Sequence, residues 1–300
     1  MTSMTNVAVF GTGVLGSQIA MQAAYHGKRV IAYDVSQELL DKLPARWEWM
    51  RAGYQRDLAD FDADRFDRAI ASITATTSLQ SAVEDADIVI EAIPENLDLK
   101  KKVWASIGAA APPKTVFTTN SSSLRPSDFA DATGRPAKFL ALHFANIVWS
   151  HNTGEVMPTP QTDPAVFEAV LSFATEIGLV AIPVRNETPG YLLNSLLIPF
   201  LNAAAYLYVD EVADPVDIDT DWKIATGSPQ GPFEVYDLVG FNVAINIMRN
   251  NPDDERLQRF ADMLEKSAKE GRSGLSDGAG FYEYDATGQS QGMAPRWKLG

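Results

Sequence analysis

The sequence contains no cysteine and only three histidines among its 300 residues. Without cysteine the chain offers no disulfide, no thiolate metal ligand and no cysteine nucleophile. Three histidines are also few for a metal cluster, so no metal site is expected. Catalysis, if present, must come from imidazole, carboxylate, hydroxyl, amide or amine groups.

Positive charge is scarce as well. The chain has 25 lysines and arginines against 39 aspartates and glutamates, which gives a formal net charge of -14. Such a surface repels polyanions over a Debye length of about 8 Å. We therefore expect neither nucleic acids nor anionic membranes as partners. An anionic cofactor would have to be bound by backbone amides.

Long apolar runs are missing. None approaches the roughly 20 residues that a membrane-spanning helix needs, and the first residues, MTSMTNVAVF, place no charged region before a hydrophobic block. At 46% hydrophobic residues, however, the chain can bury a sizeable core and is long enough for two domains. We expect a globular protein that acts in the cytoplasm.

Glycines, by contrast, are closely spaced in the stretch NVAVFGTGVLGSQIAMQAAYHGKRVIAYD, from Asn6 to Asp34. A strand-like run leads into a G-x-G-x-x-G turn, and a helix-like segment follows. Such a turn presents the backbone N–H groups of the helix start to a pyrophosphate. The dinucleotide contacts predicted at this turn are Gly11, Gly13, Val14, Leu15 and Gly16.

The aspartate that ends this stretch bears on the choice of cofactor. Asp34 lies 18 residues after Gly16, at the end of a second strand-like run. A carboxylate there accepts hydrogen bonds from ribose hydroxyls and repels the 2'-phosphate of NADP. No arginine follows in DVSQE, so the sequence favours NAD. The alternative to dinucleotide binding is that this stretch is only a glycine-rich turn in an ordinary βαβ unit.

Strand-like and helix-like segments alternate through the rest of the first half. Runs such as ADIVIEAI, TVFTTN and KFLALHF predict buried strands of a Rossmann-type, doubly wound α/β sheet, which binds ligands at the carboxyl ends of its strands. After RNETPGYLLN only helical periodicity remains. We predict an NAD-binding domain over residues 1–186 and an all-helical domain over residues 187–300, with a loosely ordered tail, DATGQSQGMAPRWKLG.

The histidines differ in their suitability as a catalytic base. His26 ends the first predicted helix, where a surface side chain is the simplest interpretation, and His151 lies in the loop WSHNTG. His143 ends a strand-like run at the sheet edge where ligands bind, and Glu155 follows twelve residues later. A carboxylate beside the imidazole would fix its tautomer and stabilise its protonated form, but the spacing alone leaves the pairing open.

Several blocks together resemble one enzyme family, the short-chain L-3-hydroxyacyl-CoA dehydrogenases, which include the 3-hydroxybutyryl-CoA dehydrogenases. The blocks are FGTGVLGSQIA, EAIPENLDLKKKV, TNSSSL, HFAN, TPGYLLNSLLIPFLN and SPQGPFEVYDLVG, and the resemblance covers residues 5–285. It implies a helical C-terminal domain through which subunits form a homodimer. It also implies reversible hydride transfer between NAD and a small-molecule (S)-3-hydroxyacyl or 3-oxoacyl substrate.

The resemblance implies roles for the matching catalytic residues. His143 is then the general base, and Glu155 orients it. Ser122 binds the substrate oxygen, and Asn194 places the carbonyl group. Simpler structural roles stay open for two of these residues, because Ser122 is also suited to a turn and Asn194 to a helix cap.

A second group matches family positions that contact the cofactor, mainly its nicotinamide half or ribose. These residues are Glu95, Lys100, Asn120 and Asn146. The simpler interpretation of Glu95 and Lys100 is a solvated ion pair at the start of a helix.

The chain departs from the family where CoA is held. The family has a serine and a lysine on the helical segment after the second strand, but alignment from Asp34 places Met50 and Asp57 there, with Arg51 and Arg56 nearby. Ser276 replaces a lysine before the GFY sequence. The loop after HFAN, which carries the bulky Trp149, replaces the proline-rich turn of the family.

Three alternatives to a CoA dehydrogenase therefore stay open. One is a dehydrogenase of small 3-hydroxy acids or 3-oxo esters without CoA. Another is a β-hydroxyacid dehydrogenase of the type that uses a lysine base, although GYLLNSLL contains no lysine. The third is a dinucleotide-binding structural protein with the same fold.

Overall fold

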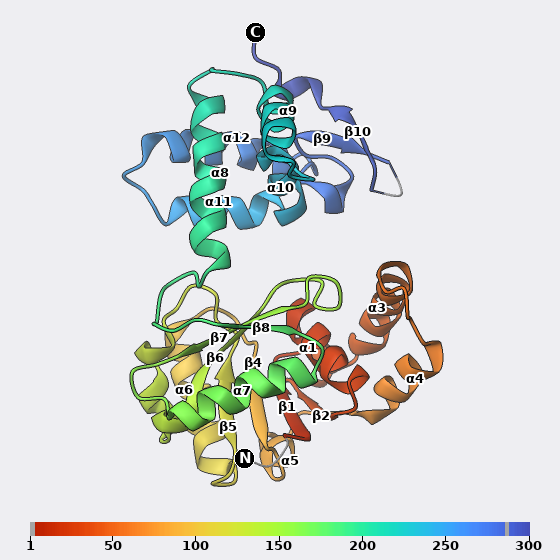
Figure 1. The fold of residues 1–300 in the computed structure, drawn as a ribbon, viewed down its shortest axis with the longest axis vertical. Coiled ribbons are helices and arrows are strands. Elements are labelled where there is room, and N and C mark those ends of the chain that lie inside the picture. The colour runs from red at the N-terminus through yellow and green to blue at the C-terminus, as the bar shows by residue number, and fades with distance from the viewer. Residues whose placement is uncertain (1–3, 286–287) are drawn as a thin grey trace. The chain divides into compact units, whose positions relative to one another are not determined.

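The computed structural model describes residues 4–285 and 288–300, which divide into two compact units between Leu192 and Leu193 (Figure 1). The division lies six residues beyond the predicted boundary at residue 186. The residues after 186 are attached to the first unit by hydrogen bonds. Glu187, for example, accepts from the backbone N–H and the hydroxyl of Ser127. Polar contacts of this kind depend on the fold and are not visible in the helical periodicity that placed the boundary.

The N-terminal unit is built on one eight-stranded sheet with the order β3-β2-β1-β4-β5-β6-β7-β8. Neighbouring strands are parallel except β6 and β7, so β7 and β8 run opposite to the rest. The sequence did not predict β7. The strands are β1 Asn6–Phe10, β2 Arg29–Tyr33, β3 Ile73–Thr76, β4 Ile88–Glu91, β5 Val116–Thr119, β6 Phe139–Phe144, β7 Thr153–Pro158 and β8 Val180–Pro183.

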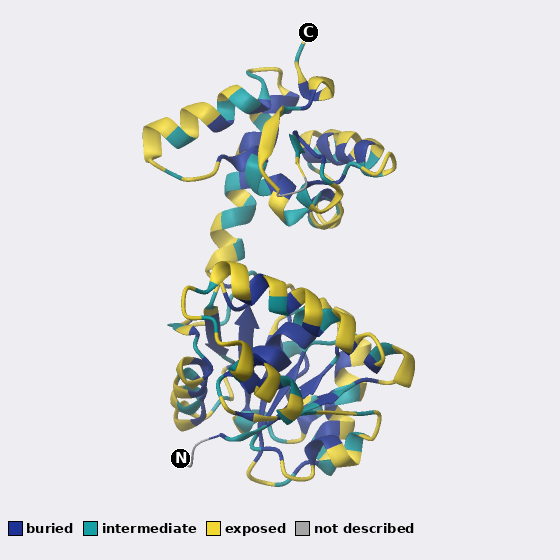
Figure 2. Ribbon diagram, turned by 90° about the vertical axis from the view of Figure 1, so that its right-hand side faces the viewer, coloured by how far each residue is buried: buried dark blue, intermediate teal, exposed yellow. Residues whose placement is uncertain are grey.

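Helices cover both faces of this sheet, as a doubly wound fold requires. Side chains alternate along β1: Val7 and Val9 pack with α1, α3, α4 and α7, whereas Ala8 and Phe10 pack with α5 and α6. Figure 2 shows the buried strands between helices with exposed outer faces. The helices are α1 Val14–Tyr25, α2 Gln37–Leu40, α3 Leu43–Asp57, α4 Ala63–Ser72, α5 Leu79–Val83, α6 Leu97–Ala110 and α7 Pro164–Glu176.

Short 3₁₀ helices complete the secondary structure of both units. They are η1 Pro126–Asp128, η2 Ala130–Thr133, η3 Pro136–Lys138, η4 Leu275–Asp277 and η5 Pro295–Trp297. Within the described ranges, no helix has both the length and the apolar character needed to cross a membrane.

The C-terminal unit is helical but not entirely so. Its elements are α8 Leu193–Val209, α9 Pro215–Thr226, α10 Pro232–Val239, α11 Phe241–Arg249, α12 Glu255–Ala268 and the antiparallel strands β9 Tyr282–Tyr284 and β10 Ser290–Met293. The expectation of a loosely ordered tail was wrong for the described part of that stretch, because Trp297 is buried against Phe281 and donates to the Gly280 carbonyl. Residues 286–287 of the stretch lie outside the described residues.

Two buried carboxylates organise the C-terminal unit. Asp219 accepts from the N–H groups of Phe233 and Glu234 at the start of α10. Asp237 accepts from the N–H groups of Phe281 and Tyr282 and from a tyrosine hydroxyl, at 2.7–2.9 Å. Burial raises the pKa of Asp237 to about 6, although these backbone N–H groups favour its ionised form. Asp237 thus holds β9 against α10.

Removal of this carboxylate should destabilise the C-terminal unit. Asp237→Ala leaves two buried backbone N–H groups and the half-buried Tyr284 hydroxyl without their acceptor, so we expect the free energy of unfolding to fall by about 3 kcal/mol in urea denaturation. Asp253→Ala, at an exposed position in the same unit, should change it by less than about 0.5 kcal/mol. Equal losses for the two variants would contradict the role of Asp237.

Candidate active site

The candidate site lies where the strand order reverses, between β1 and β4, at the carboxyl ends of the strands. This is the place where open α/β sheets bind ligands. A cavity of about 240 Å³ is found there. It brings the glycine turn together with predicted substrate and cofactor residues, and its lining is Gly13, Val14, Leu15, Gly16, Ala92, Ile93, Glu95, Asn120 and Ser122.

The glycine turn has the shape that a dinucleotide needs. Gly11 has φ +94°, and a Cβ on it would lie 2.6 Å from the Ala92 carbonyl oxygen. A Cβ on Gly16 would lie 1.9 Å from the Gly11 oxygen, whereas the space beside Gly13 is open. Helix α1 has neither an acidic residue in its first turn nor a side-chain cap at Gly13. Its N-terminal amides and dipole are therefore suited to a pyrophosphate.

Asp34 is held at the end of β2 by the same turn. Its Oδ2 accepts from both the N–H and the hydroxyl of Thr12 at 2.7 Å, and Oδ1 accepts from the N–H of Val35 at 2.8 Å. A carboxylate has about four acceptor sites, so it can still accept from ribose hydroxyls. Thr12, which the sequence analysis did not identify, thus orients Asp34 toward the turn. The residues present fit NAD.

The strand register places the predicted base beside its carboxylate. His143 on β6 is the direct cross-strand partner of Glu155 on β7. The side chains of directly opposed residues lie on the same face of a sheet. The His143 Nδ1 atom lies 2.9 Å from Glu155 Oε2, and both residues are buried. The pairing that the sequence left open is therefore present.

This contact determines which imidazole nitrogen is basic. An ionised carboxylate only accepts hydrogen bonds, so Nδ1 of His143 carries the proton beside Glu155. In the neutral ring Nε2 is then the free base, and the exposed Ser122 lies with its Oγ 3.0 Å away. A substrate hydroxyl that lies beside this pair would be within hydrogen-bond reach of both groups.

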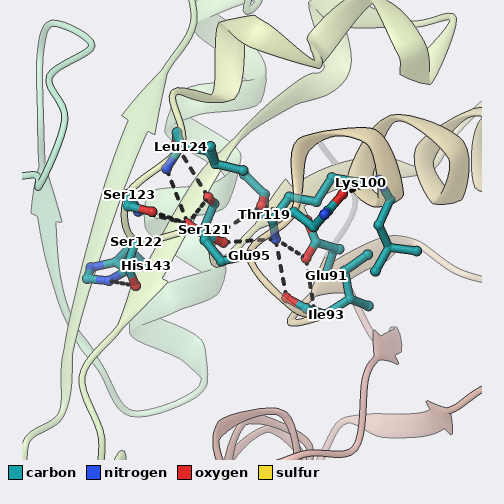
Figure 3. Close-up of polar contacts among 12 residues, drawn as sticks. Glu91, Ile93, Glu95, Lys100, Thr119, Ser121, Ser122, Ser123, Leu124 and His143 are labelled. Carbon is teal, nitrogen blue, oxygen red and sulfur yellow. Dashed lines mark hydrogen bonds and ion pairs between the residues drawn. The ribbon is translucent and has the colours of Figure 1, made fainter. Parts of the chain in front are cut away.

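Glu95 holds the loop that carries Ser122 (Figure 3). Its Oε1 accepts from the Ser121 and Ser123 hydroxyls at 2.6 and 3.0 Å and from the Ser123 and Leu124 N–H groups at 2.8 and 3.2 Å. Burial alone would raise the pKa of Glu95, but the hydrogen bonds and the charge of Lys100 outweigh it and lower the pKa to about 2. Glu95 is therefore ionised at neutral pH.

Lys100 lies beneath this loop and is almost fully buried. Its Nζ lies 2.6 Å from Glu91 Oε1 and 3.3 Å from Glu95 Oε2, so the simpler interpretation as a solvated pair was wrong. Glu91, with no exposed surface, also accepts from Trp104 Nε1 and the Thr119 hydroxyl. Glu91 was not identified from the sequence, although an acidic residue inside the apolar run ADIVIEAI is a signal of a buried charge.

The predicted asparagines lie in different places. Asn120 lines the cavity, and its side-chain oxygen accepts from the N–H of Phe144, which links the ends of β5 and β6. Asn146 is exposed in the loop after β6, and its carbonyl lies 3.2 Å from Nδ1 of His151. Asn194 is the second residue of α8, in the C-terminal unit. It therefore does not occupy the N-cap position, which precedes the first residue of a helix.

The loop after β6 is fixed to α3 through Trp149. The indole packs against Gly53, where a Cβ would lie 2.4 Å from the ring, and its Nε1 donates to Asp57 at 2.9 Å. The Arg56 hydrogen bond, together with that of Trp149, lowers the pKa of Asp57. Met50 is buried in the core, so it offers no ligand contact, and Arg51 is paired with Asp67.

Comparisons with known proteins agree on one family. The family model described as "3-hydroxyacyl-CoA dehydrogenase, NAD binding domain" matches residues 6–188. The model of the C-terminal domain of the same family matches residues 190–284. The human mitochondrial hydroxyacyl-coenzyme A dehydrogenase is 34% identical over 286 residues, which cover 93% of this chain and 91% of that protein. A probable 3-hydroxybutyryl-CoA dehydrogenase of Bacillus subtilis (strain 168) is 31% identical and covers 93% and 97%.

Two solved structures extend these likenesses. A diketoreductase described as acting on dicarbonyl compounds is 49% identical, with a TM-score of 0.90 and coverage of 95% of this chain and 100% of that one. The (S)-3-hydroxybutyryl-CoA dehydrogenase of Ralstonia eutropha is 27% identical, with a TM-score of 0.81 and coverage of 94% and 100%.

Loss of the Glu95 charge should make the free energy of unfolding depend less on pH in the acidic range. The pKa of Glu95 is about 2 in the folded protein against an ordinary value of 4.5. Its ionised form therefore stabilises the fold above about pH 4.5, and this stabilisation is lost as the pH falls toward 2. Between about pH 5 and 3 the free energy of unfolding should fall more in the wild type than in Glu95→Gln, as measured by urea denaturation.

The matched control is Glu84→Gln, which removes an exposed carboxylate from the same unit. It should follow the wild-type curve. A Glu95→Gln curve parallel to that of the wild type would show that Glu95 is not stabilised in its ionised form.

Proposed function

The chain belongs to the 3-hydroxyacyl-CoA dehydrogenase family, an NAD-dependent group of oxidoreductases, and from this premise we propose that its cavity interconverts (S)-3-hydroxyacyl and 3-oxoacyl groups. The observation that carries the proposal is the hydrogen-bonded line Glu155–His143–Ser122. Ser122 lines the same cavity as the glycine turn, so the proposed base lies beside the nucleotide-binding residues.

The chain's own residues divide the work between binding and proton transfer. NAD, when bound, supplies the acceptor for the hydride that leaves C3. The amides at the start of α1 would hold its pyrophosphate, and Asp34 would hold its ribose. Following the resemblance, we assign further cofactor contacts to Glu95, Lys100, Asn120 and Asn146, with Lys100 acting mainly by holding Glu95.

Proton transfer falls to His143. Its Nε2 accepts the proton of the 3-hydroxyl group, and the imidazolium that results is stabilised by the carboxylate of Glu155 on Nδ1. In the reverse direction the imidazolium returns the proton to the alkoxide. Ser122 donates a hydrogen bond to the reacting oxygen, which stabilises the charge that develops there.

Assembly and location form part of the same proposal. Asn194, on α8 of the C-terminal unit, is assigned the family role of placing the carbonyl. A homodimer through this unit is supported by apolar side chains that the single chain leaves exposed, among them Leu196, Val212 and Ile224. The cytoplasmic location rests on the sequence alone, whereas the human relative is named as a mitochondrial protein.

Replacement of the base tests the mechanism. His143→Gln should lower kcat for NADH-dependent reduction of a 3-oxoacyl substrate by about 100-fold or more, because general acid-base groups contribute about 10² to 10⁴-fold. NADH binding, followed by fluorescence titration, should persist. Glu155→Gln should cost less, since the imidazole stays in place. His151→Gln is the control, and a large loss there with little loss in His143→Gln would move the role to His151.

A second candidate function is the reduction of small 3-oxo acids or esters that carry no CoA. The phosphates of CoA need strong contacts with basic side chains. At the positions expected to provide them, Met50 is buried and Asp57 is an anion fixed by Arg56 and Trp149. The 49% identity with a diketoreductase that acts on dicarbonyl compounds supports this candidate.

The two candidates differ in kcat/KM. For a small-substrate enzyme we expect acetoacetyl-CoA to be preferred over an acetoacetate ester by less than about 10⁴-fold, which corresponds to about 5.5 kcal/mol of transition-state binding. Asp57→Asn should raise kcat/KM several-fold for the CoA ester only, because it removes a negative charge. Asp60→Asn, an exposed neighbour, is the control. A preference for acetoacetyl-CoA above about 10⁴-fold would contradict the small-substrate candidate and support a CoA thioester as the substrate.

A further inference from the structure

The last two residues of the N-terminal unit contact three parts of the candidate site. The Tyr191 ring is stacked on the His143 imidazole, with centroids 4.3 Å apart and planes 8° from parallel. Its hydroxyl donates to the Ser121 carbonyl at 2.6 Å, and the Leu192 N–H donates to Glu155 Oε1 at 2.8 Å. Neither residue takes part in the proton transfer proposed for His143 and Ser122.

A strained backbone presents the tyrosine ring. Gly190 has φ +82° and Tyr191 has φ +53°, which is an uncommon conformation for a bulky residue. The Tyr191 N–H closes the turn on the Thr188 carbonyl at 3.3 Å. The ring is buried with Ala141, Met157 and Val184. Packing therefore maintains a conformation that the chain disfavours locally, as occurs at sites where geometry serves function.

The phenol is poorly suited to proton transfer. Burial raises the pKa of Tyr191, and the surrounding carboxylates, among them Glu95 and Glu155, raise it further. Its proton is already donated to the Ser121 carbonyl. The contribution of Tyr191 must therefore come from the stacked ring and from the position of the hydroxyl, not from acid catalysis.

We propose that Tyr191 is a positioning residue that fixes the plane of the His143 imidazole and joins it to the Ser122 loop, while Leu192 fixes Glu155. This inference rests on the proposed function. A parallel aromatic face limits rotation of the imidazole and keeps Nε2 directed at Ser122. The same face is electron-rich, so it favours the imidazolium that forms when His143 takes the proton.

Kinetics test the positioning role through three variants. Tyr191→Leu should lower kcat by about ten- to 100-fold, since small misplacement of a catalytic group costs rates of this order. The Kd for NADH should stay within about twofold, because the nucleotide turn is untouched. Tyr191→Phe, which keeps the ring, should restore most of kcat. Tyr208→Leu removes a buried tyrosine from the C-terminal core and controls for stability alone.

A spectroscopic signature separates positioning from general destabilisation. The chain has three histidines, so with ¹³C-labelled imidazole the Cε1–H resonance of His143 is assigned by its loss in His143→Gln. A stacked ring shifts this proton upfield. The shift should persist in Tyr191→Phe and vanish in Tyr191→Leu. If the leucine variant does not fold, Tyr191→Met, which fills space without a ring, replaces it.

The outcomes distinguish this inference from the mechanism on which it rests. An unmoved His143 resonance in Tyr191→Leu, or an unchanged kcat, overturns the positioning role. A fully active His143→Gln would instead overturn the proposed function, whatever the resonance shows. Loss of the upfield shift together with a kcat that falls in the leucine variant and recovers in the phenylalanine variant supports the inference.

Discussion

The antiparallel pairing of β6 with β7 is the constraint on which the candidate site depends. The strands β1 to β6 are parallel to one another, whereas β7 runs in the opposite direction. This change of direction places Glu155 directly opposite His143. A shift of register by one residue would turn one of the two side chains to the other face of the sheet. The pairing also defines the tautomer, because a carboxylate on Nδ1 leaves Nε2 as the base.

Buried charge is the second element of the site, and each charge has a partner. Lys100 compensates Glu91 and Glu95 in a region where unpaired ions would be costly. Glu95 uses its negative charge to hold four hydroxyl and N–H donors of the loop that carries Ser122. Glu91, Glu95 and Lys100 can therefore influence the candidate site without contacting a substrate, because Glu95 holds the loop that positions the Ser122 hydroxyl.

The positions expected to contact CoA lie in a different part of the N-terminal unit. The Trp149 side chain joins the loop after β6 to α3 and engages Asp57. Gly53 is required for this contact, because a Cβ at that position would overlap the indole. The proposed proton transfer and the proposed substrate choice thus involve different elements. The candidate base and its carboxylate lie on β6 and β7, whereas Asp57 and Trp149 lie on α3 and on the loop after β6.

The sequence by itself determined the fold class and the dinucleotide-binding turn, and it singled out His143 as the candidate base. These features depend on residues close together in the chain or on periodicity, and Gly11, Gly16 and Asp34 act within one βαβ unit. Only the tertiary structure decided that Glu155 meets His143, that Lys100 is buried with Glu91, and that Tyr191 stacks on the imidazole. These contacts depend on strand register, burial and a strained turn, which bring side chains together in ways that their spacing along the chain does not specify.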